Sequence, residues 1–249
     1  SAYLSCDCRS EQKATEVMKN GTGHGLFVTG TDTGIGKTYV ARLLLEGFAG
    51  QQASTYMKPV QTGCIRDAAG NLTAPDFDYV MKNGAVMTAE LDNHVPYRFE
   101  PACSPHLAAA LAGVTISLEH IRENYSRVSD KKSITIVEGA GGVLTPLSET
   151  TTMIDLMLHL RLPVVLVTSP RVGTINHSLL TLEALAKRGI EPAGIVVNNV
   201  HNVPENFIYH DTLRILRYHT PHAAILQVGH DAVCDDDIRE FCRALLERL

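Results

Sequence analysis

Short apolar runs and longer amphipathic stretches alternate along the chain from residue 25 onward. Unbroken apolar runs are typical of strands that are buried on both faces of a parallel sheet. The stretches between them carry apolar residues at the spacing of a helix, most clearly at Leu179, Leu182, Leu185 and Ala186, with Gly189 as the expected stop. The pattern predicts six strands, at residues 26–29, 54–58, 134–138, 164–168, 195–198 and, more weakly, 224–228.

This alternation predicts a single-domain α/β fold with a doubly wound, mainly parallel sheet. A chain of 249 residues can bury one large core, and its composition marks no boundary between domains. Residues 1–24 are polar and aperiodic, and Ser1 is not a start methionine. We therefore expect a flexible, processed or added leader at 1–24 and one domain at 25–249. Prolines interrupt the pattern between residues 60 and 131, which predicts a long excursion that carries function.

The first predicted strand leads into a glycine-rich turn, Gly30-Thr-Asp-Thr-Gly-Ile-Gly-Lys37-Thr38, and a helical pattern follows it. In that order the N–H groups of the turn and of the helix N-terminus point at one spot, where they can bind phosphate. Lys37 adds a positive charge, and the hydroxyl of Thr38 can ligate Mg²⁺. Five residues separate Gly30 from Gly36 where the usual pattern has four, so the loop is a variant. We interpret it as a nucleoside triphosphate site, with an ordinary glycine turn as the alternative.

Polar residues follow several of the predicted strands, at the edge where parallel strands place their ligands. Lys58 ends the second strand and could neutralise charge that develops during phosphoryl transfer, whereas the plainer interpretation is a surface lysine. Thr62 and Gly63 would approach the same ligand. Glu138 closes the third strand, where a buried carboxylate needs a compensating cation.

Magnesium would supply that compensation, because phosphates and water complete its octahedron and few protein oxygens are needed. Thr38, Glu138 and Asp76 would suffice, and Asp78 is an alternative ligand. A carboxylate that simply favours the start of a helix explains Asp76 equally well on local grounds. Asn176 and His177, taken alone, indicate a capping asparagine beside a packing histidine.

The composition of the chain limits the kinds of binding partner that we expect. The net charge of -5 and the hydrophobic fraction of 45% imply no nucleic-acid surface. Six cysteines without paired Cys-x2-Cys spacing are expected to be reduced thiols, and Cys6-Asp-Cys8 is expected to lie in a terminus rather than to hold a metal. The apolar runs are too short for a membrane span and no signal-peptide region opens the chain, so we expect a cytoplasmic protein without a membrane partner.

Five motifs together resemble the dethiobiotin synthetase family of P-loop NTPases, over roughly residues 25 to 200 and in order. They are Val28-Thr-Gly-Thr-Asp-Thr-Gly-Ile-Gly-Lys-Thr38, Lys58-Pro-Val-Gln-Thr-Gly63, Glu100-Pro-Ala-Cys-Ser-Pro-His106, Val137-Glu-Gly-Ala-Gly-Gly142 and Gly173-Thr-Ile-Asn-His177. Linked motifs are far more specific than any one of them.

The resemblance implies a homodimeric ligase of biotin biosynthesis that uses ATP and Mg²⁺ to close a cyclic urea on 7,8-diaminononanoate with CO₂. An amino group of the substrate forms a carbamate, whose oxygen attacks the γ-phosphorus of ATP, and the second amine then displaces phosphate. The products are dethiobiotin, ADP and phosphate.

The resemblance also assigns roles to individual positions. It implies that Lys37, Lys58 and Thr62 are catalytic, and that Thr38, Asp76 and Glu138 bind the metal. The positions that match nucleotide contacts are Thr33, Gly34, Ile35, Gly36, Lys37, Thr38 and Asn198, the last of which would read the purine. Those that match contacts to the diamine or the carbamate are Thr33, Lys58, Thr62, Gly141 and Asn176, the last across the dimer interface.

Two departures from the family pattern affect these expectations. Gly34 stands where some relatives carry glutamate, and the segment Leu226-Gln-Val-Gly-His230 replaces a Gly-x-Ile-Pro segment near the base, so the nucleotide preference stays open. An amide-forming synthetase of the cobyrinic acid type would need a glutaminase domain for which the chain has no room. A partitioning-type switch ATPase would carry an extra lysine where Thr31 and Asp32 stand, and a non-catalytic nucleotide-binding module would leave Lys58 and Glu138 without a purpose.

Overall fold

The computed structural model describes residues 24–83, 91–129 and 133–249. The expected leader lies outside these residues apart from its last position, and so does the Cys6-Asp-Cys8 pair. The four cysteines within the described residues, Cys64, Cys103, Cys234 and Cys242, are free thiols. No helix in the described part of the chain is both long enough and apolar enough to cross a bilayer.

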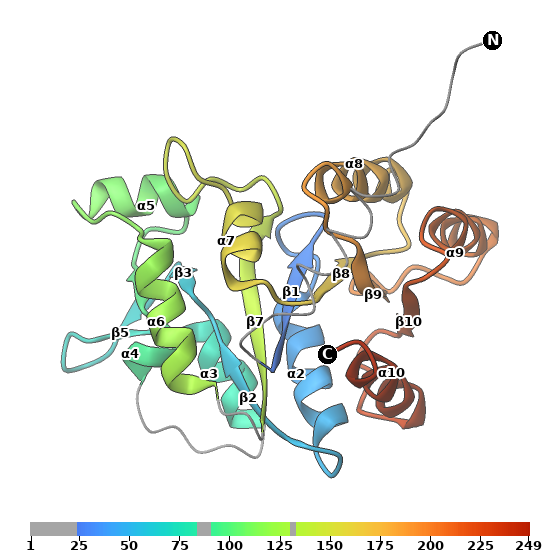
Figure 1. Cartoon of the computed structure of the whole chain (residues 1–249), viewed down its shortest axis with the longest axis horizontal. Coiled ribbons are helices and arrows are strands. Elements are labelled where there is room, and N and C mark those ends of the chain that lie inside the picture. The colour runs from blue at the N-terminus through green and yellow to red at the C-terminus, as the bar shows by residue number, and fades with distance from the viewer. Residues whose placement is uncertain (1–23, 84–90, 130–132) are drawn as a thin grey trace, which may run out of the picture.

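A six-stranded sheet forms the centre of the molecule, and all of its neighbouring strands pair in parallel. The strands follow one another across Figure 1 in the order β2, β7, β1, β8, β9, β10. Their bounds are β1 (Gly25–Gly30), β2 (Ala53–Met57), β7 (Ser133–Gly142), β8 (Val164–Thr168), β9 (Pro192–Asn198) and β10 (Ala224–Val228). All six predicted strands are thus confirmed, and the chain reverses its direction of winding at β1.

One strand differs from its prediction in a way that matters for the site. Glu138 does not close β7, because the strand continues through the glycines to Gly142. Its pairing with β1 is regular up to Glu138, which faces Val28, and becomes irregular before Gly142, which faces Gly30. Glycine tolerates such a distortion, and Gly141 adopts a positive φ of 65° that favours this residue type. The carboxylate therefore projects from within the sheet.

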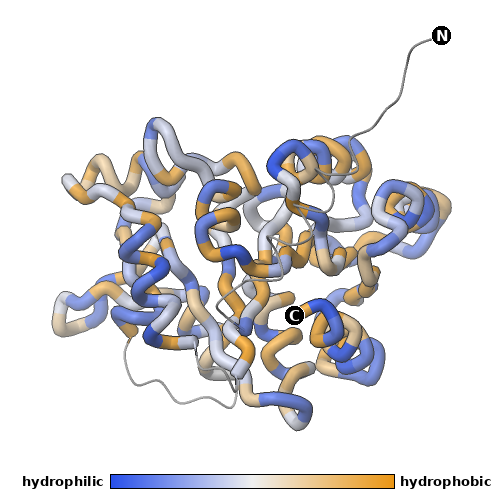
Figure 2. Tube along the Cα trace, viewed as in Figure 1, coloured by the Kyte–Doolittle hydropathy of each residue, from blue (hydrophilic) through white to orange (hydrophobic). Residues whose placement is uncertain are grey.

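Helices cover both faces of the sheet, as a doubly wound fold requires. One face packs on α2 (Lys37–Phe48), α3 (Pro75–Asn83) and α10 (Asp236–Leu246), and the other on α6 (Leu118–Val128), α7 (Met153–Leu160), α8 (Thr174–Ala186) and α9 (Phe207–His219). Strand residues alternate between these two cores: Val165 and Val167 face α2, whereas Leu166 faces α9. Hydrophobic and hydrophilic residues accordingly alternate along the outer helices in Figure 2.

The excursion after the second strand builds small structures of its own. A parallel pair joins β3 (Val60–Thr62) to β6 (Tyr97–Phe99), and an antiparallel pair joins β4 (Ile65–Arg66) to β5 (Leu72–Thr73). The short helix α4 (Leu91–His94) precedes β6, and α5 (Pro105–Leu111) follows it, with Ser104 as its cap. The predicted irregular segment therefore supplies these two small sheets and the helix α3, which carries Asp76 in its first turn.

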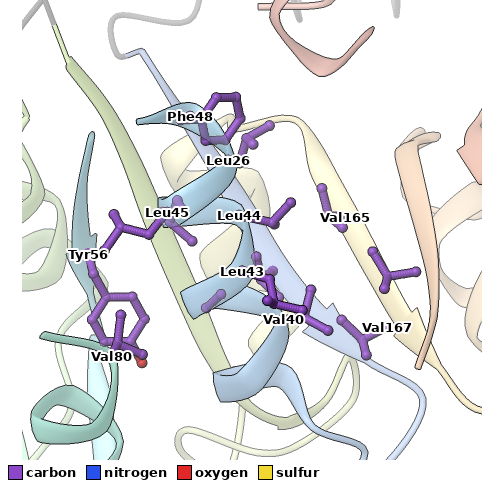
Figure 3. Close-up of a cluster of buried hydrophobic side chains, with 14 of the residues drawn as sticks. Leu26, Val40, Leu43, Leu44, Leu45, Phe48, Tyr56, Val80, Val165 and Val167 are labelled. Atoms are coloured by element: carbon purple, nitrogen blue, oxygen red, sulfur yellow. The ribbon is translucent and has the colours of Figure 1, made fainter. Parts of the chain in front are cut away.

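Leu44 tests how strongly the α2 core stabilises the fold. Its side chain is fully buried beside Val40, Phe48 and Val165 (Figure 3), so Leu44→Ala leaves a cavity and is expected to lower the free energy of unfolding by about 2–5 kcal/mol. Leu180→Ala, the same change at a side chain that is 57% exposed on α8, is expected to stay within about 0.5 kcal/mol. Urea unfolding monitored by circular dichroism measures both, and equal losses would contradict this assignment of the core.

Candidate functional site

The phosphate loop connects β1 to α2 at the carboxyl edge of the sheet. Gly36 precedes the helix in the left-handed conformation, with φ of 87°, and no side chain caps the first turn. The free N–H groups of a helix start attract anions. A Cβ atom at Gly36 would lie 2.1 Å from Nδ2 of Asn198, the same nitrogen that donates a 3.0 Å hydrogen bond to the carbonyl of Ile35. Glycine is therefore required at this position, and Ile35 anchors the loop in the core.

Lys37 lies at the start of α2 with its side chain buried. Its Nζ donates a 2.9 Å hydrogen bond to the backbone oxygen of Asp32, within the loop. Burial and the nearby charge of Lys58 lower the pKa of Lys37 to about 8, although Glu138 and Asp76 oppose this shift. An anion bound in the loop would relieve the repulsion between the two lysines, so the electrostatics favour a phosphate ligand.

A buried ion cluster lies beside the loop. Nζ of Lys58, which follows β2, is 2.6 Å from Oε1 of Glu138 and 2.7 Å from Oδ2 of Asp76. Lys58 is 4% exposed and Glu138 is 1% exposed. Burial by itself would lower the pKa of Lys58, but the two carboxylates outweigh it and raise the pKa above its ordinary value. Lys58 is thus a positive charge, held away from water, and not a surface lysine.

The sheet order explains why residues so far apart in sequence meet here. β7 lies between β1 and β2, so Glu138 is flanked by the phosphate loop on one side and by Lys58 on the other. Oγ1 of Thr38 donates a 2.9 Å hydrogen bond to Oε1 of Glu138. Asp76 reaches the same place from the first turn of α3, and it is Asp76 rather than Asp78 that pairs with Lys58.

The oxygens of Thr38, Asp76 and Glu138 form a donor set that fits Mg²⁺. Both carboxylates converge on a single positive charge, and the hydroxyl lies within hydrogen-bond distance of one of them. No group of three or more acidic, histidine or cysteine side chains that could hold a metal occurs among the described residues. The set is therefore suited to a metal that phosphate and water also coordinate, and not to one held by protein alone.

Two contacts of the site were not anticipated from the sequence. The hydroxyl of Tyr56, on β2, donates a 2.6 Å hydrogen bond to Oε2 of Glu138. Burial and the Glu138 charge raise the pKa of Tyr56 well above its ordinary value, so the hydroxyl keeps its proton. Arg171, after β8, pairs with Asp32 of the loop at 3.2 Å. The sequence signal that could have found Tyr56 is the alternation of side chains along a strand. Tyr56 and Lys58 are two residues apart, so they face the same side of the sheet.

The remaining predicted residues lie on the phosphate loop, β3, α8 and β9. Thr33 and Gly34 are exposed in the phosphate loop, and Thr62 ends β3. Asn176 is exposed in the first turn of α8, but Gly173 is the cap of that helix, so the interpretation of Asn176 as a capping residue was wrong. A purine contact by Asn198 stays a prediction. Oδ1 of Asn198 is buried without a hydrogen-bond partner among the described residues, while Nδ2 is engaged by the loop.

Comparison with known proteins identifies the family to which the chain is similar. A family model described as an AAA domain matches residues 24–235. The ATP-dependent dethiobiotin synthetase BioD of Fusobacterium nucleatum is 37% identical over 219 residues, which are 86% of this chain and 96% of the relative. The protein of the same name from Nitrosospira multiformis is 39% identical over 217 residues, 85% of this chain and 92% of the relative.

Solved structures resemble the chain in fold alone. A putative plasmid partition protein from Borrelia burgdorferi has a TM-score of 0.54 at 10% identity, covering 90% of this chain and 97% of the other. HypB from Helicobacter pylori has a TM-score of 0.50 at 16% identity, covering 97% of this chain and 94% of the other. Together with the phosphate loop and the parallel sheet, these likenesses confirm the P-loop fold. The identities and coverage of the curated relatives show more, namely that the chain belongs to the ATP-dependent dethiobiotin synthetase family.

Proposed function

We propose that the protein closes the ureido ring of dethiobiotin from 7,8-diaminononanoate and CO₂, with ATP as the co-substrate. The observation that carries this proposal is the ammonium of Lys58, which is buried between Glu138 and Asp76 beside the phosphate loop. A reaction whose intermediates are a carbamate and a mixed anhydride gains most from fixed positive charge, positioning and exclusion of water. The site offers these features without requiring a protein nucleophile.

The proposed reaction has three steps. One amine of the substrate adds to CO₂ and loses a proton, which gives a carbamate. A carbamate oxygen then attacks the γ-phosphorus of ATP, and ADP leaves. Finally the second amine attacks the carbamoyl carbon, the bond from that carbon to the phosphate oxygen breaks, and ring closure releases phosphate. Lys37 would bind the phosphates, and Lys58 would neutralise charge on the carbamate and the transferred phosphoryl group.

In this proposal Thr38, Asp76 and Glu138 would hold Mg²⁺. The bound ion would screen the negative charge of the β- and γ-phosphates while the phosphoryl group is transferred. The convergence of two carboxylates and one hydroxyl beside the phosphate loop supports this role.

The other assigned residues would position the substrates. Thr33, Thr62, Gly141 and Asn176 would contact the diamine or its carbamate, and Asn198 would contact the nucleotide base. Asn198 has the chemistry for this, because its buried Oδ1 can accept a hydrogen bond while Nδ2 holds the loop.

We also propose that the protein is a homodimer. Leu111 of α5 is 66% exposed and Leu144, in the loop after β7, is 61% exposed. The two segments are neighbours, since the backbone N–H of His106 donates to the carbonyl of Pro146. Exposed apolar side chains from adjoining segments favour association with another surface. Light scattering tests this proposal, and a monomeric mass at micromolar concentration would reject it.

The direct test of the activity follows labelled bicarbonate into an acid-stable product. A closed urea survives acid, whereas a carbamate does not. Incorporation is expected only when ATP, Mg²⁺ and 7,8-diaminononanoate are all present, with one ADP formed for each label incorporated. ATP hydrolysis without incorporation would reject the ligase and favour a nucleotide-dependent switch.

Lys58→Gln tests the positive charge in the ion cluster. Because the amide cannot neutralise developing charge, kcat is expected to fall by at least about 100-fold while ATP binding, measured by calorimetry, is retained. Lys187→Gln is the matched control, since Lys187 is an exposed lysine at the far end of α8 that pairs only with Glu183 among its described ion-pair partners. Near-normal turnover of Lys58→Gln would remove Lys58 from the reaction.

A pair of aspartates on α3 tests the metal assignment. Asp76→Asn is expected to raise the Mg²⁺ concentration for half-maximal activity by about tenfold or more, because one of the two carboxylates is lost. Asp78→Asn, the same change two residues along, should leave the Mg²⁺ titration close to that of the unaltered protein. The reverse result would make Asp78 the ligand, and two unchanged titrations would reject a metal site at α3.

A further inference from the structure

We propose that Tyr56 is a positioning residue that fixes the orientation of the Glu138 carboxylate. The inference rests on the proposed metal role of Glu138. It adds a residue that no part of that proposal uses, and one that lies on a different strand from Glu138.

The hydrogen bonds divide the two oxygens of Glu138 between separate tasks. Oε2 accepts the Tyr56 hydroxyl at 2.6 Å, and Oε1 faces Thr38 at 2.9 Å and Lys58 at 2.6 Å. The terminal torsion of a glutamate is broad, so the carboxylate by itself has no single preferred orientation. A donor fixed on Oε2 removes this freedom and directs Oε1 towards the loop and the lysine.

Tyr56 is well suited to be a fixed donor because its own position is held from several sides. Its side chain is fully buried, and its ring lies 6.0 Å from that of Phe77, the neighbour of Asp76. Phe77 in turn packs against His94 at 5.4 Å. Nδ1 of His94 donates to the carbonyl of Tyr56 at 2.7 Å, and the backbone N–H of Lys58 donates to the carbonyl of His94 at 2.8 Å.

This arrangement connects three charged groups through one aromatic cluster, defined by Tyr56, Phe77 and His94. Tyr56 donates a hydrogen bond to Glu138, and the ring of Phe77, the residue after Asp76, packs against the ring of Tyr56. His94 is hydrogen-bonded to the backbone of both Tyr56 and Lys58. Partners that orient the ligands of a metal typically change its affinity by 10–100-fold when they are removed. A similar effect is expected from the loss of a single hydroxyl here.

Tyr56→Phe removes that hydroxyl and keeps the ring. Its effect is tested by Mn²⁺ binding to the protein with a non-hydrolysable ATP analogue. Electron paramagnetic resonance of free Mn²⁺ reports this binding without requiring turnover. The dissociation constant for Mn²⁺ is expected to rise about tenfold. Affinity for the analogue without metal should be unchanged. Tyr125→Phe, at a buried tyrosine in the core on the opposite face, is the matched control and should leave Mn²⁺ binding unaltered.

A double-mutant cycle separates positioning from general destabilisation. If Tyr56 acts through Glu138, then Tyr56→Phe should have no further effect on Mn²⁺ binding in a Glu138→Ala background. A tenfold effect that persists without Glu138, or a change below twofold in the single variant, would overturn the inference. Thermal unfolding of each variant verifies that it is folded, and the bicarbonate assay reports separately on the proposed ligase activity, so the two proposals fail by different results.

Discussion

The buried contact of Lys58 with Glu138 and Asp76 is the constraint on which the rest of the site depends. An unpaired charge in a protein interior is very costly, and a buried ion pair is tolerated only with close geometry and further hydrogen bonds. The fold meets both requirements, with separations of 2.6 and 2.7 Å and with donors from Thr38 and Tyr56 on the Glu138 carboxylate. These contacts offset the cost of burying the charges. The strands and helices that carry the charged residues are fixed by their hydrophobic cores, so the charges are arranged before any ligand binds.

The strand order makes this arrangement possible. With β1 in the centre and β7 between it and β2, the carboxyl edge of the sheet brings the phosphate loop, Glu138 and Lys58 into one row. Loop and sheet are also connected on the other side, because Asn198 of β9 holds the carbonyl of Ile35 and Arg171 pairs with Asp32. A loop held from both sides presents its N–H groups in a fixed geometry, which is what electrostatic stabilisation of a phosphoryl group requires.

The sequence was sufficient for the six strands, since apolar runs buried on both faces leave a clear pattern. It also pointed to Lys58, Glu138 and Asp76, although local grounds could not separate Asp76 from Asp78; that choice depends on where α3 docks. Tyr56 was missed because a tyrosine in an apolar strand is ordinarily a core residue, and its hydroxyl has meaning only once β2 lies beside β7. Glu138 was placed at a strand end because glycines usually interrupt strands, whereas these continue the pairing with a distortion. Asn176 resembled a cap, but Gly173, with its positive φ, is the cap of the helix.

The proposed function requires that the ion cluster direct a carbamate oxygen, and not water, to the γ-phosphorus of ATP. Oxygen labelling tests this claim most directly. The protein is incubated briefly with ATP, 7,8-diaminononanoate and C¹⁸O₂ in unlabelled water, before the label exchanges with solvent, and the phosphate is analysed by mass spectrometry. The account predicts one ¹⁸O atom in each phosphate released, because the carbon–oxygen bond breaks when the ring closes. Phosphate without ¹⁸O would show that water attacks the phosphorus and would contradict the account.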